Sequence, residues 1–385
     1  MRFEFATAGR IIFGEGAAKE VGALAAELGT HALLITGRTV ERAGPVEHSL
    51  REAGLTVEVF PIPGEPTFAI VRQAVAAARQ AAVDMLVAVG GGSPLDAAKA
   101  VAALLTNGGD PLDYAEVIGP GKSFTKPAVP FIAIPTTAGT GTEVTRNAVL
   151  ASPEQRVKVS LRSPYLLPTA AVVDPELTYS LPPAQTAYTG LDALTQLIEP
   201  YVSARANPIS DAISAEGIRR VARSLRRAVQ AGGDVQARQD MALASLFGGI
   251  ALANAGLGAV HGFANPFGGM FPRAPHGAVC ASLLTATTEV NILAARQRSD
   301  GGRLLARYAD VARLLTGEQD ARPEQATAWL RVLCHGLSIP PLGAYGLRQA
   351  DIPDLIERAS RASSMRANPV ALTPDEMRQI VVQAM

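Results

Sequence analysis

The two halves of the chain differ in how apolar and polar residues alternate. Over roughly the first 175 residues, short apolar runs rich in β-branched residues alternate with amphipathic stretches, which is typical of strand–helix units and a largely parallel sheet. The strands expected from this pattern are His31–Thr36, Val57–Ile62, Met85–Val89, Phe131–Pro135, Val157–Leu161 and Ala170–Val173. The helices expected between them are Ala17–Leu28, Glu41–Ala53, Phe68–Ala82 and Pro94–Leu105, with Thr67 as N-cap of the third.

The pattern changes after Asp174-Pro175. From about Pro182 onward the sequence is rich in alanine, has helical periodicity and shows almost no β-branched alternation. The helices expected there include Ala184–Tyr201, Ile209–Gln230, Val235–Ala255, Gly277–Ala295 and Arg303–Leu315. We therefore predict an α/β N-terminal domain with a largely parallel sheet over residues 1–178 and an all-helical C-terminal domain over residues 179–385.

Charge and composition narrow the class of partner. The chain has 385 residues, of which 48% are hydrophobic, and its 35 basic and 35 acidic residues give a net charge of zero. Because no basic block is present, we expect neither a nucleic acid nor a membrane as partner. Only two cysteines occur, Cys280 and Cys334, and the N-terminus has no apolar segment of signal-peptide length. These features favour a cytoplasmic protein.

A glycine-rich turn is the first candidate for a ligand-binding site. The apolar strand ending at Val89 runs into Gly90-Gly91-Gly92, and a helix is expected to start at once, with Ser93 as N-cap, Pro94 at its first position and Asp96 three residues after the cap. Glycines let the backbone approach a ligand, and free N–H groups at a helix start attract phosphate. A tight turn without a ligand is the alternative.

A second loop strengthens the case for a nucleotide site. The strand ending at Pro135 is followed by the segment TTAGTGTEVT, residues 136–145, which is dense in hydroxyl groups and backbone amides. It lies at the end of an expected parallel strand, which is where α/β sheets bind ligands. Two such loops at two strand ends therefore predict a bound nucleotide.

The helical half contains a candidate metal site. Asp192 and Gln196 stand four residues apart on one face of an expected helix, and His261 and His276 lie in one short glycine-rich stretch. The chain has only five histidines. Two imidazoles with one carboxylate form a set that suits Fe(II), whereas each histidine taken alone is more often a hydrogen-bonded core residue.

Taken together, these segments resemble the iron-dependent (group III) alcohol dehydrogenases, which are related to glycerol dehydrogenase and maleylacetate reductase. The similarity covers essentially the whole chain and is carried, in this order, by VGGGSPLDAAKA, PTTAGTGTEVT, VVDPEL, GLDAL and VHGFANPFGG…APHG. The resemblance implies an N-terminal dinucleotide-binding domain, a helical C-terminal domain and an active site in the cleft between them. It also implies an NAD(P)-dependent oxidoreductase that interconverts an alcohol and an aldehyde or ketone with the help of a divalent metal.

The resemblance also assigns residues to the cofactor. Gly91, Gly92 and Ser93 are expected at the pyrophosphate, with Asp96 in the helix that follows. The hydroxyls expected to line the cofactor cleft belong to Thr136, Thr137, Thr140 and Thr142. Lys158 matches a position that contacts the cofactor ribose, although an ordinary solvated lysine is the alternative.

The family's metal site takes one Asp and three His residues. Asp192, His261 and His276 match three of these positions and are the expected catalytic residues, whereas Gln196 occupies the fourth, where the family has His. Asn265 also replaces a histidine that family members carry four residues after His261. Since an amide is a poorer ligand for Fe(II) or Zn(II) than imidazole, we expect a loosely bound metal.

The choice of cofactor depends on the end of the second strand. Family members that use NAD carry an Asp there, which binds the adenosine ribose, whereas this chain has Gly37 followed by Arg38. Loss of the carboxylate removes the repulsion of a 2′-phosphate, and Arg38 can pair with one. We expect NADP or NAD as cofactor, with a slight preference for NADP.

Three functions remain open at this point. The first is a metal-assisted alcohol dehydrogenase or aldehyde reductase, and the second is a metal-independent reductase of the maleylacetate reductase type. The third is a nucleotide-binding homologue without catalysis. The expected partner is a small alcohol or carbonyl substrate, whose identity the sequence does not reveal, and the resemblance suggests a homodimer.

Overall fold

The computed structural model describes residues 2–298 and 301–385. These residues form two compact units. One takes in Ala6–Thr137 and Gly141–Ser180, and the other takes in the residues up to Phe5, Ala138–Thr140 and Leu181–Met385. We call them the sheet unit and the helical unit. Compact units are not folding domains, so the domain boundary at residue 178 stays a prediction.

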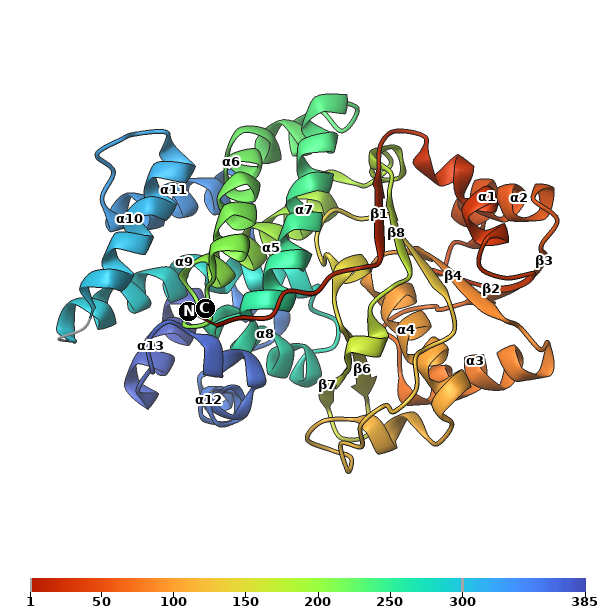
Figure 1. The fold of residues 1–385 in the computed structure, drawn as a ribbon. Coiled ribbons are helices and arrows are strands. Elements are labelled where there is room, and N and C mark those ends of the chain that lie inside the picture. The colour runs from red at the N-terminus through yellow and green to blue at the C-terminus, as the bar shows by residue number, and fades with distance from the viewer. Residues whose placement is uncertain (1, 299–300) are drawn as a thin grey trace. The chain divides into compact units, whose positions relative to one another are not determined.

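The sheet unit is built on six parallel strands in the order β1-β8-β5-β4-β2-β3 (Figure 1). Their bounds are β1 Arg10–Phe13, β2 His31–Thr36, β3 Thr56–Pro61, β4 Met85–Gly90, β5 Phe131–Pro135 and β8 Ala170–Val173. The central strands β4 and β5 are buried along their whole length, as expected of a parallel sheet covered on both faces. The predicted fold class is confirmed.

Helices cover both faces of this sheet and define two cores. Their bounds are α1 Val21–Ala26, α2 Gly44–Glu52, α3 Phe68–Gln80 and α4 Gly92–Asn107. Leu33 and Ile35 pack in the core formed with α3 and α4, whereas Ala32 and Leu34 pack in the core formed with α1 and α2. Neighbouring side chains of a strand point to opposite faces, so one strand contributes to both cores. Thr67 caps α3 by accepting a hydrogen bond from the Ile70 N–H, as predicted.

Three local predictions for this unit need correction. The predicted N-cap Ser93 lies inside α4, which begins at Gly92 with Gly91 as its N-cap, because the glycines reach helical backbone angles one residue earlier. The predicted closing strand at Val157–Leu161 is β7, Val157–Arg162, which pairs antiparallel with β6, Asn147–Ser152, in a separate ribbon. Edge strand β1 was not predicted, because it is short and only partly buried.

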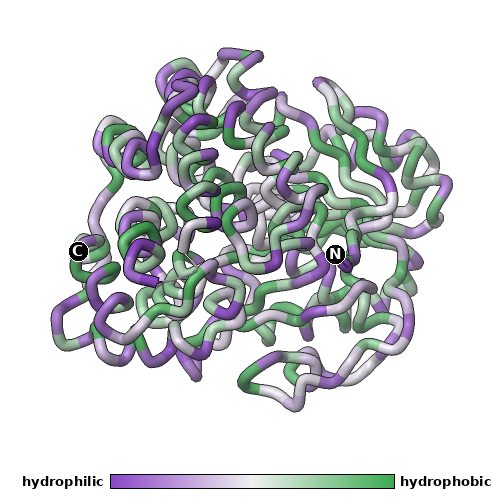
Figure 2. Tube along the Cα trace, turned by 60° about the vertical axis from the view of Figure 1, so that its left-hand side comes forward, coloured by the Kyte–Doolittle hydropathy of each residue, from purple (hydrophilic) through white to green (hydrophobic). Residues whose placement is uncertain are grey.

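The helical unit is a bundle around one large core. Its helices are α5 Pro183–Val202, α6 Pro208–Gln230, α7 Val235–Ala255, α8 Ala259–Met270, α9 His276–Gln297, α10 Gly302–Thr316, α11 Pro323–Gly336, α12 Ile352–Arg361 and α13 Pro374–Ala384. Apolar and polar residues alternate along many of these helices (Figure 2), and helices such as α6 and α12 bury one face in the core. All five helices predicted in this half are present, each within a few residues of its expected bounds.

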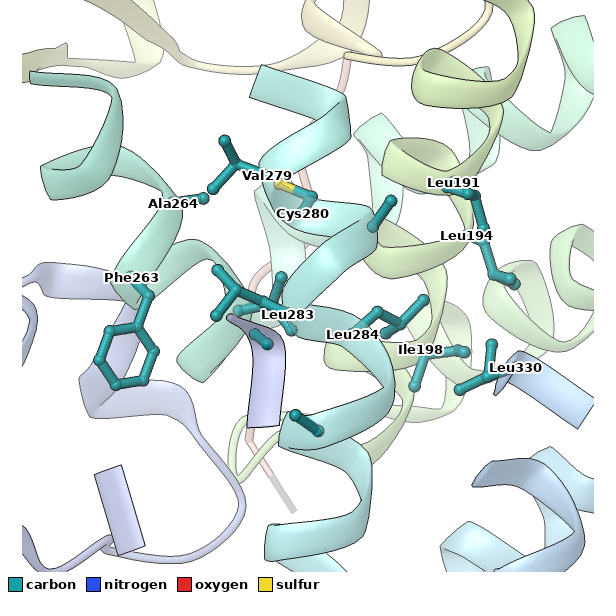
Figure 3. Packing of buried hydrophobic residues seen from close by; sticks show 14 of the residues in the cluster. Leu191, Leu194, Ile198, Phe263, Ala264, Val279, Cys280, Leu283, Leu284 and Leu330 are labelled. Atoms are coloured by element: carbon teal, nitrogen blue, oxygen red, sulfur yellow. The ribbon is translucent and has the colours of Figure 1, made fainter. Parts of the chain in front are cut away.

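Helix α9 runs through the middle of this core. Cys280, Leu283 and Leu284 point from it toward residues of α5 and α8 (Figure 3). By length and composition alone α9 is the one described helix able to cross a membrane, and 78% of its apolar window is buried in the protein. Its apolar character is therefore explained by its place in the core.

The contact between α1 and α2 yields a prediction about stability. A Cβ atom at Gly22 would lie 2.1 Å from the backbone oxygen of Ser49, whereas a Cβ atom at Gly44 would meet nothing within 4 Å. We expect Gly22→Ala to lower the free energy of unfolding by about 1–3 kcal/mol. Gly44→Ala, the matched control, should leave it unchanged or raise it by up to about 1 kcal/mol. Urea denaturation of both variants checks this, and equal effects would contradict it.

Candidate active site

The predicted cofactor loops meet at one edge of the sheet. Strand β4 lies between β2 and β5, with Val89 paired to Thr36 and Gly90 paired to Pro135. The residues that follow these strands therefore leave the sheet side by side at its carboxyl edge. The strand order reverses between β2 and β4, because β3 lies on one side of β2 and β4 on the other. This is the position where open α/β sheets bind ligands.

The glycines of the turn after β4 differ in what they do. Gly90 has a φ of +156°, and a Cβ atom there would lie 2.5 Å from Pro94 Cγ, so the fold itself requires a glycine. Gly91 has an ordinary φ of −74°, and a Cβ atom there would make only van der Waals contact, at 3.5 Å, with Thr137. Packing does not explain the glycine at 91.

The start of α4 has the properties of an anion site. No side chain caps this helix, so the first N–H groups after Gly91 are not satisfied by a capping side chain. Ser93, Thr136 and Thr137 are half-buried around it and bring hydroxyl groups from the two neighbouring strand ends. Thr140 belongs to the helical unit instead.

A buried lysine fixes the second loop to α4. The Lys99 ammonium donates hydrogen bonds to the hydroxyls of Thr142 and Thr145, at 2.7 Å each, and to the Asn147 carbonyl at 3.0 Å. The Thr142 hydroxyl donates in turn to the carboxylate of Asp96, which lies 3.7 Å from Lys99. Asp96 and Thr142, both predicted in the cofactor site, are thus engaged in holding the loop that carries Thr142 against the helix.

Burial shifts the titration of the charged groups in this network. It lowers the pKa of Lys99 to about 8, against the attraction of Asp96. It raises the pKa of Glu143 to about 7, although the nearby Lys99 ammonium opposes this. The Glu143 Oε2 atom has no hydrogen-bond partner among the described residues. Glu143 is therefore a buried carboxyl that keeps its proton in weak acid.

Three other predicted cofactor residues lie in the sheet unit. Lys158 on β7 is nearly buried and forms an ion pair with Glu65 at 2.9 Å, so it is not the solvated lysine of the alternative interpretation. Gly37 follows β2, and a Cβ atom there would find only Pro94 Cγ, at 3.9 Å. Arg38 is exposed and donates from Nε to the Pro63 carbonyl.

In the helical unit, the predicted metal residues converge. Asp192 lies on α5, His261 on α8 and His276 at the first position of α9. Asp192 Oδ1 lies 3.4 Å from His261 Nε2 and 3.9 Å from His276 Nε2. Cys280, one turn beyond His276, completes the group, because one ligand atom of each of the four residues lies within 4.8 Å of all the others.

Two glycines allow this convergence. Gly256 has a φ of +74° in the break between α7 and α8, where the chain turns by 100°. Gly277 lies against α5, and a Cβ atom there would be 2.3 Å from the backbone oxygen of Tyr188. The missing side chain lets the start of α9, with its histidine, approach Asp192.

Glu199 orients the first histidine. Its Oε2 atom lies 2.7 Å from His261 Nδ1, and its Oε1 atom accepts a hydrogen bond from the Val260 N–H at 2.7 Å. A carboxylate at Nδ1 places the proton on that nitrogen and points Nε2 toward Asp192 and Cys280. This carboxylate–imidazole arrangement is the usual support of a metal-binding histidine.

Gln196 contacts Asp192 directly. Its Nε2 donates to Asp192 Oδ2 at 3.1 Å, and its Oε1 is buried without a hydrogen-bond partner among the described residues. A flipped amide would place two oxygens in contact, so the hydrogen bond fixes this orientation. Gln196 therefore orients the carboxylate through the amide end that cannot bind a metal.

Charges in the cluster sustain one another despite burial. Burial favours the neutral form of Asp192, but His276 and His261 together hold its pKa below the usual value. Burial likewise opposes charge on His261, but Cys280, Glu199 and Asp192 raise its pKa well above the usual value. Burial raises the pKa of the Cys280 thiol to about 12. Positive charge on His261 therefore compensates the buried carboxylates of Asp192 and Glu199.

Sequence reasoning missed Glu199 and Cys280. Both signals were present, because Glu199 lies seven residues after Asp192 and Cys280 four residues after His276, spacings that share a helix face.

The residues present fit a divalent cation. Asp192 is 2% exposed, and its Oδ1, which faces both imidazoles, has no hydrogen-bond partner among the described residues. A buried carboxylate oxygen without a partner is costly unless a cation binds it. With two imidazole nitrogens alongside, the donors suit Fe(II) or Zn(II).

Comparison with known proteins gives the family. A family model described as iron-containing alcohol dehydrogenase matches residues 8–175, and the C-terminal model of the same family matches residues 186–385. The chain belongs to the iron-containing alcohol dehydrogenases. The 1,3-propanediol dehydrogenase of Klebsiella pneumoniae is 38% identical to it over 387 residues, which cover 97% of this chain and 96% of the relative.

Solved structures agree with this membership. A crystal structure of 1,3-propanediol oxidoreductase has a TM-score of 0.93 and 36% identity, and the match covers 100% of both chains. The sulfoacetaldehyde reductase from Bifidobacterium kashiwanohense, solved in complex with NAD+, has a TM-score of 0.87 and 28% identity, covering 100% of this chain and 99% of that one. This alcohol dehydrogenase is thus an oxidoreductase that interconverts alcohols and carbonyl compounds.

The buried carboxyl of Glu143 gives a prediction about pH. The folded enzyme keeps this proton up to about pH 7, whereas the unfolded chain releases it near the ordinary pKa of 4.5. The folded state therefore binds more protons in this window, and its stability falls as the pH rises. We expect Glu143→Gln to be more stable than the wild type by roughly 2–3 kcal/mol at pH 8, with the gain shrinking toward pH 5.

Urea denaturation at several pH values measures this difference. The exposed Glu58→Gln on β3 is the matched control and should show no such trend. A gain for Glu143→Gln that is independent of pH would contradict the prediction.

Proposed function

We propose that this enzyme transfers a hydride between NAD(P)H and the carbonyl carbon of a small aldehyde or ketone. The observation that carries the proposal is the convergence of His261 and His276 on a buried Asp192 oxygen that has no hydrogen bond among the described residues. These three are the proposed catalytic residues. The pyrophosphate of the cofactor is proposed to lie at the start of α4, where Gly91 is the glycine that packing does not explain.

Each proposed residue has a defined task. Asp192, His261 and His276 would hold a divalent metal, which supplies polarisation of the substrate oxygen when bound. Glu199 keeps His261 Nε2 available, and Gln196 holds Asp192 in place. Gly91, Gly92 and Ser93 would bind the pyrophosphate, and Thr136 and Thr137 would line its path.

The remaining cofactor residues are proposed in supporting roles. Asp96 and Thr142 fix the loop, Lys158 is proposed near the ribose, and Thr140 is proposed in the cofactor cleft on the family resemblance alone. Gly37 and Arg38 are proposed at the adenosine ribose, where the absence of a carboxylate favours NADP slightly over NAD. The relative solved with NAD+ supports a nicotinamide cofactor in general.

Location and assembly complete the proposal. Both cysteines are free thiols, which suits a reducing compartment such as the cytoplasm. Strand β1 is an edge strand with exposed residues such as Ile11, and an unpaired strand edge is a natural contact for a second copy. We therefore propose a cytoplasmic homodimer that acts on a small molecule.

A metal-independent reductase is the second candidate. The observation that favours it is Gln196, which stands where the family has a ligating histidine and bonds to Asp192 instead. In that case the His276 side chain would stabilise the developing alkoxide by a hydrogen bond.

The two candidates are separated by His276→Ala. For the metal-assisted enzyme we expect loss of bound metal and at least a hundred-fold lower kcat/KM for aldehyde reduction, because a ligand is removed. The matched control is His335→Ala, an exposed histidine on α11 that should leave both unchanged. Metal analysis and NAD(P)H oxidation measure the two effects. Wild-type turnover that persists after chelation would support the metal-independent reductase.

The choice of cofactor is tested by Gly37→Asp. The position has room for a side chain and needs no positive φ, so the variant is expected to fold normally. A carboxylate there would accept the ribose hydroxyls of NADH and repel the 2′-phosphate of NADPH. We expect the ratio of kcat/KM for NADPH to that for NADH to fall by at least ten-fold. The control is Gly37→Asn, which adds similar bulk without charge, and a wild type with a strong preference for NADH would refute the proposal.

A further inference from the structure

We propose that Cys280 is a metal ligand of this enzyme and takes the place of the imidazole that is missing at position 196. The site would then be Asp192, His261, His276 and Cys280, a set with one thiolate that favours Zn²⁺ over Fe²⁺. This inference rests on the proposed metal-assisted function and specifies Zn²⁺ as the metal of that site.

Four of the ligand–ligand distances in the cluster lie within about 0.5 Å of those around a tetrahedral ion. Zinc bonds of about 2.3 Å to sulfur and about 2.0–2.1 Å to nitrogen separate sulfur and nitrogen ligands by about 3.6 Å, and nitrogen and oxygen ligands by about 3.4 Å. Cys280 Sγ lies 3.6 Å from His276 Nε2 and 3.8 Å from His261 Nε2. The corresponding distances from Asp192 Oδ1 are 3.9 and 3.4 Å.

The thiol is directed into the site by its helix. Cys280 stands one turn after His276 on α9, so the two side chains share a face. Cys280 is fully buried, and its sulfur lies within 4.8 Å of a carboxylate oxygen of Asp192, which supplies negative charge for a cation. Binding forms a metal–sulfur bond and releases the thiol proton to solvent, without any change of oxidation state.

Gln196 leaves the fourth position to the cysteine. Its amide nitrogen donates to Asp192 Oδ2, so the end of the amide nearest the carboxylate cannot bind a metal, and an amide oxygen is a poorer ligand than a thiolate. In place of the histidine that is absent at position 196, Cys280 therefore binds the ion, and Gln196 orients Asp192. Because thiolate is a softer ligand than imidazole, the exchange moves the preference of the site from Fe²⁺ toward Zn²⁺.

Cobalt substitution tests this directly. A cysteine thiolate bound to Co²⁺ gives a charge-transfer band in the near ultraviolet, which imidazole and carboxylate ligands do not give. We expect the purified full-length enzyme, stripped of metal and titrated with Co²⁺, to bind one equivalent and to show this band. Cys280→Ser should lose the band and bind Zn²⁺ at least ten-fold more weakly in competition with a chromogenic chelator.

Three further variants make the result specific. Cys334→Ser removes the other thiol, which lies outside the cluster, and should keep both the band and the affinity. Gln196→Ala should keep the band with weaker binding, because it disturbs only the orientation of Asp192. The double variant Cys280→Ala with Gln196→His should bind metal without the band and should lower the ratio of Zn²⁺ to Fe²⁺ affinity. Circular dichroism confirms that each variant is folded.

The outcomes separate this inference from the proposed function. A cobalt enzyme without the band, or Cys280→Ser with wild-type affinity and spectrum, overturns the role of Cys280 while metal-assisted hydride transfer stands. A wild type that binds no Co²⁺ or Zn²⁺ also overturns it, and turnover of NAD(P)H by that same preparation shows whether hydride transfer remains. The band in the wild type, with its loss in Cys280→Ser alone among the single variants, supports the assignment.

Discussion

A carboxylate buried in an apolar core is the constraint on which the helical unit depends. Asp192 is 2% exposed, and burying an ionised carboxylate without compensation costs several kcal/mol. Every other feature of the cluster compensates this charge. Gln196 donates to one oxygen, two imidazoles face the other, and Glu199 in turn stabilises positive charge on one of these imidazoles. A buried carboxylate of this kind destabilises the fold, but it can bind a cation.

In the sheet unit, the proposed cofactor site is formed by the backbone and by hydroxyl groups, and not by buried charges. The central strands end together at one edge of the sheet. In the turn after β4, Gly90 is required by the backbone conformation, and Gly91 is proposed to leave room for the cofactor. The buried charged groups Lys99 and Asp96 fix the loop that begins at Thr142. An anionic cofactor would therefore meet N–H groups and hydroxyls that are already in place, which reduces the entropy lost on binding.

Much of this architecture could be predicted from the sequence. The buried strands β2, β4 and β5 and the long helices have strong periodicity, and residue types and spacing pointed to both loops and to three of the residues that converge in the helical unit. Edge strand β1 and the β6–β7 ribbon were harder, since short half-exposed strands carry little pattern. The start of α4 was misplaced because glycine can adopt cap or helix angles equally well. Cys280 escaped notice because a cysteine in an apolar helix is usually a core residue.

The position of the proposed metal ligands on helix α9 links metal binding to the stability of the fold. The first turn of α9 holds His276 and Cys280, while the rest of the helix passes through the core. An ion held by α5, α8 and α9 would tie together, in the folded state, segments that are distant along the chain. Metal supply would then govern the lifetime of the folded protein as well as its chemistry, because a ligand that binds only the native state withdraws molecules from the unfolded pool.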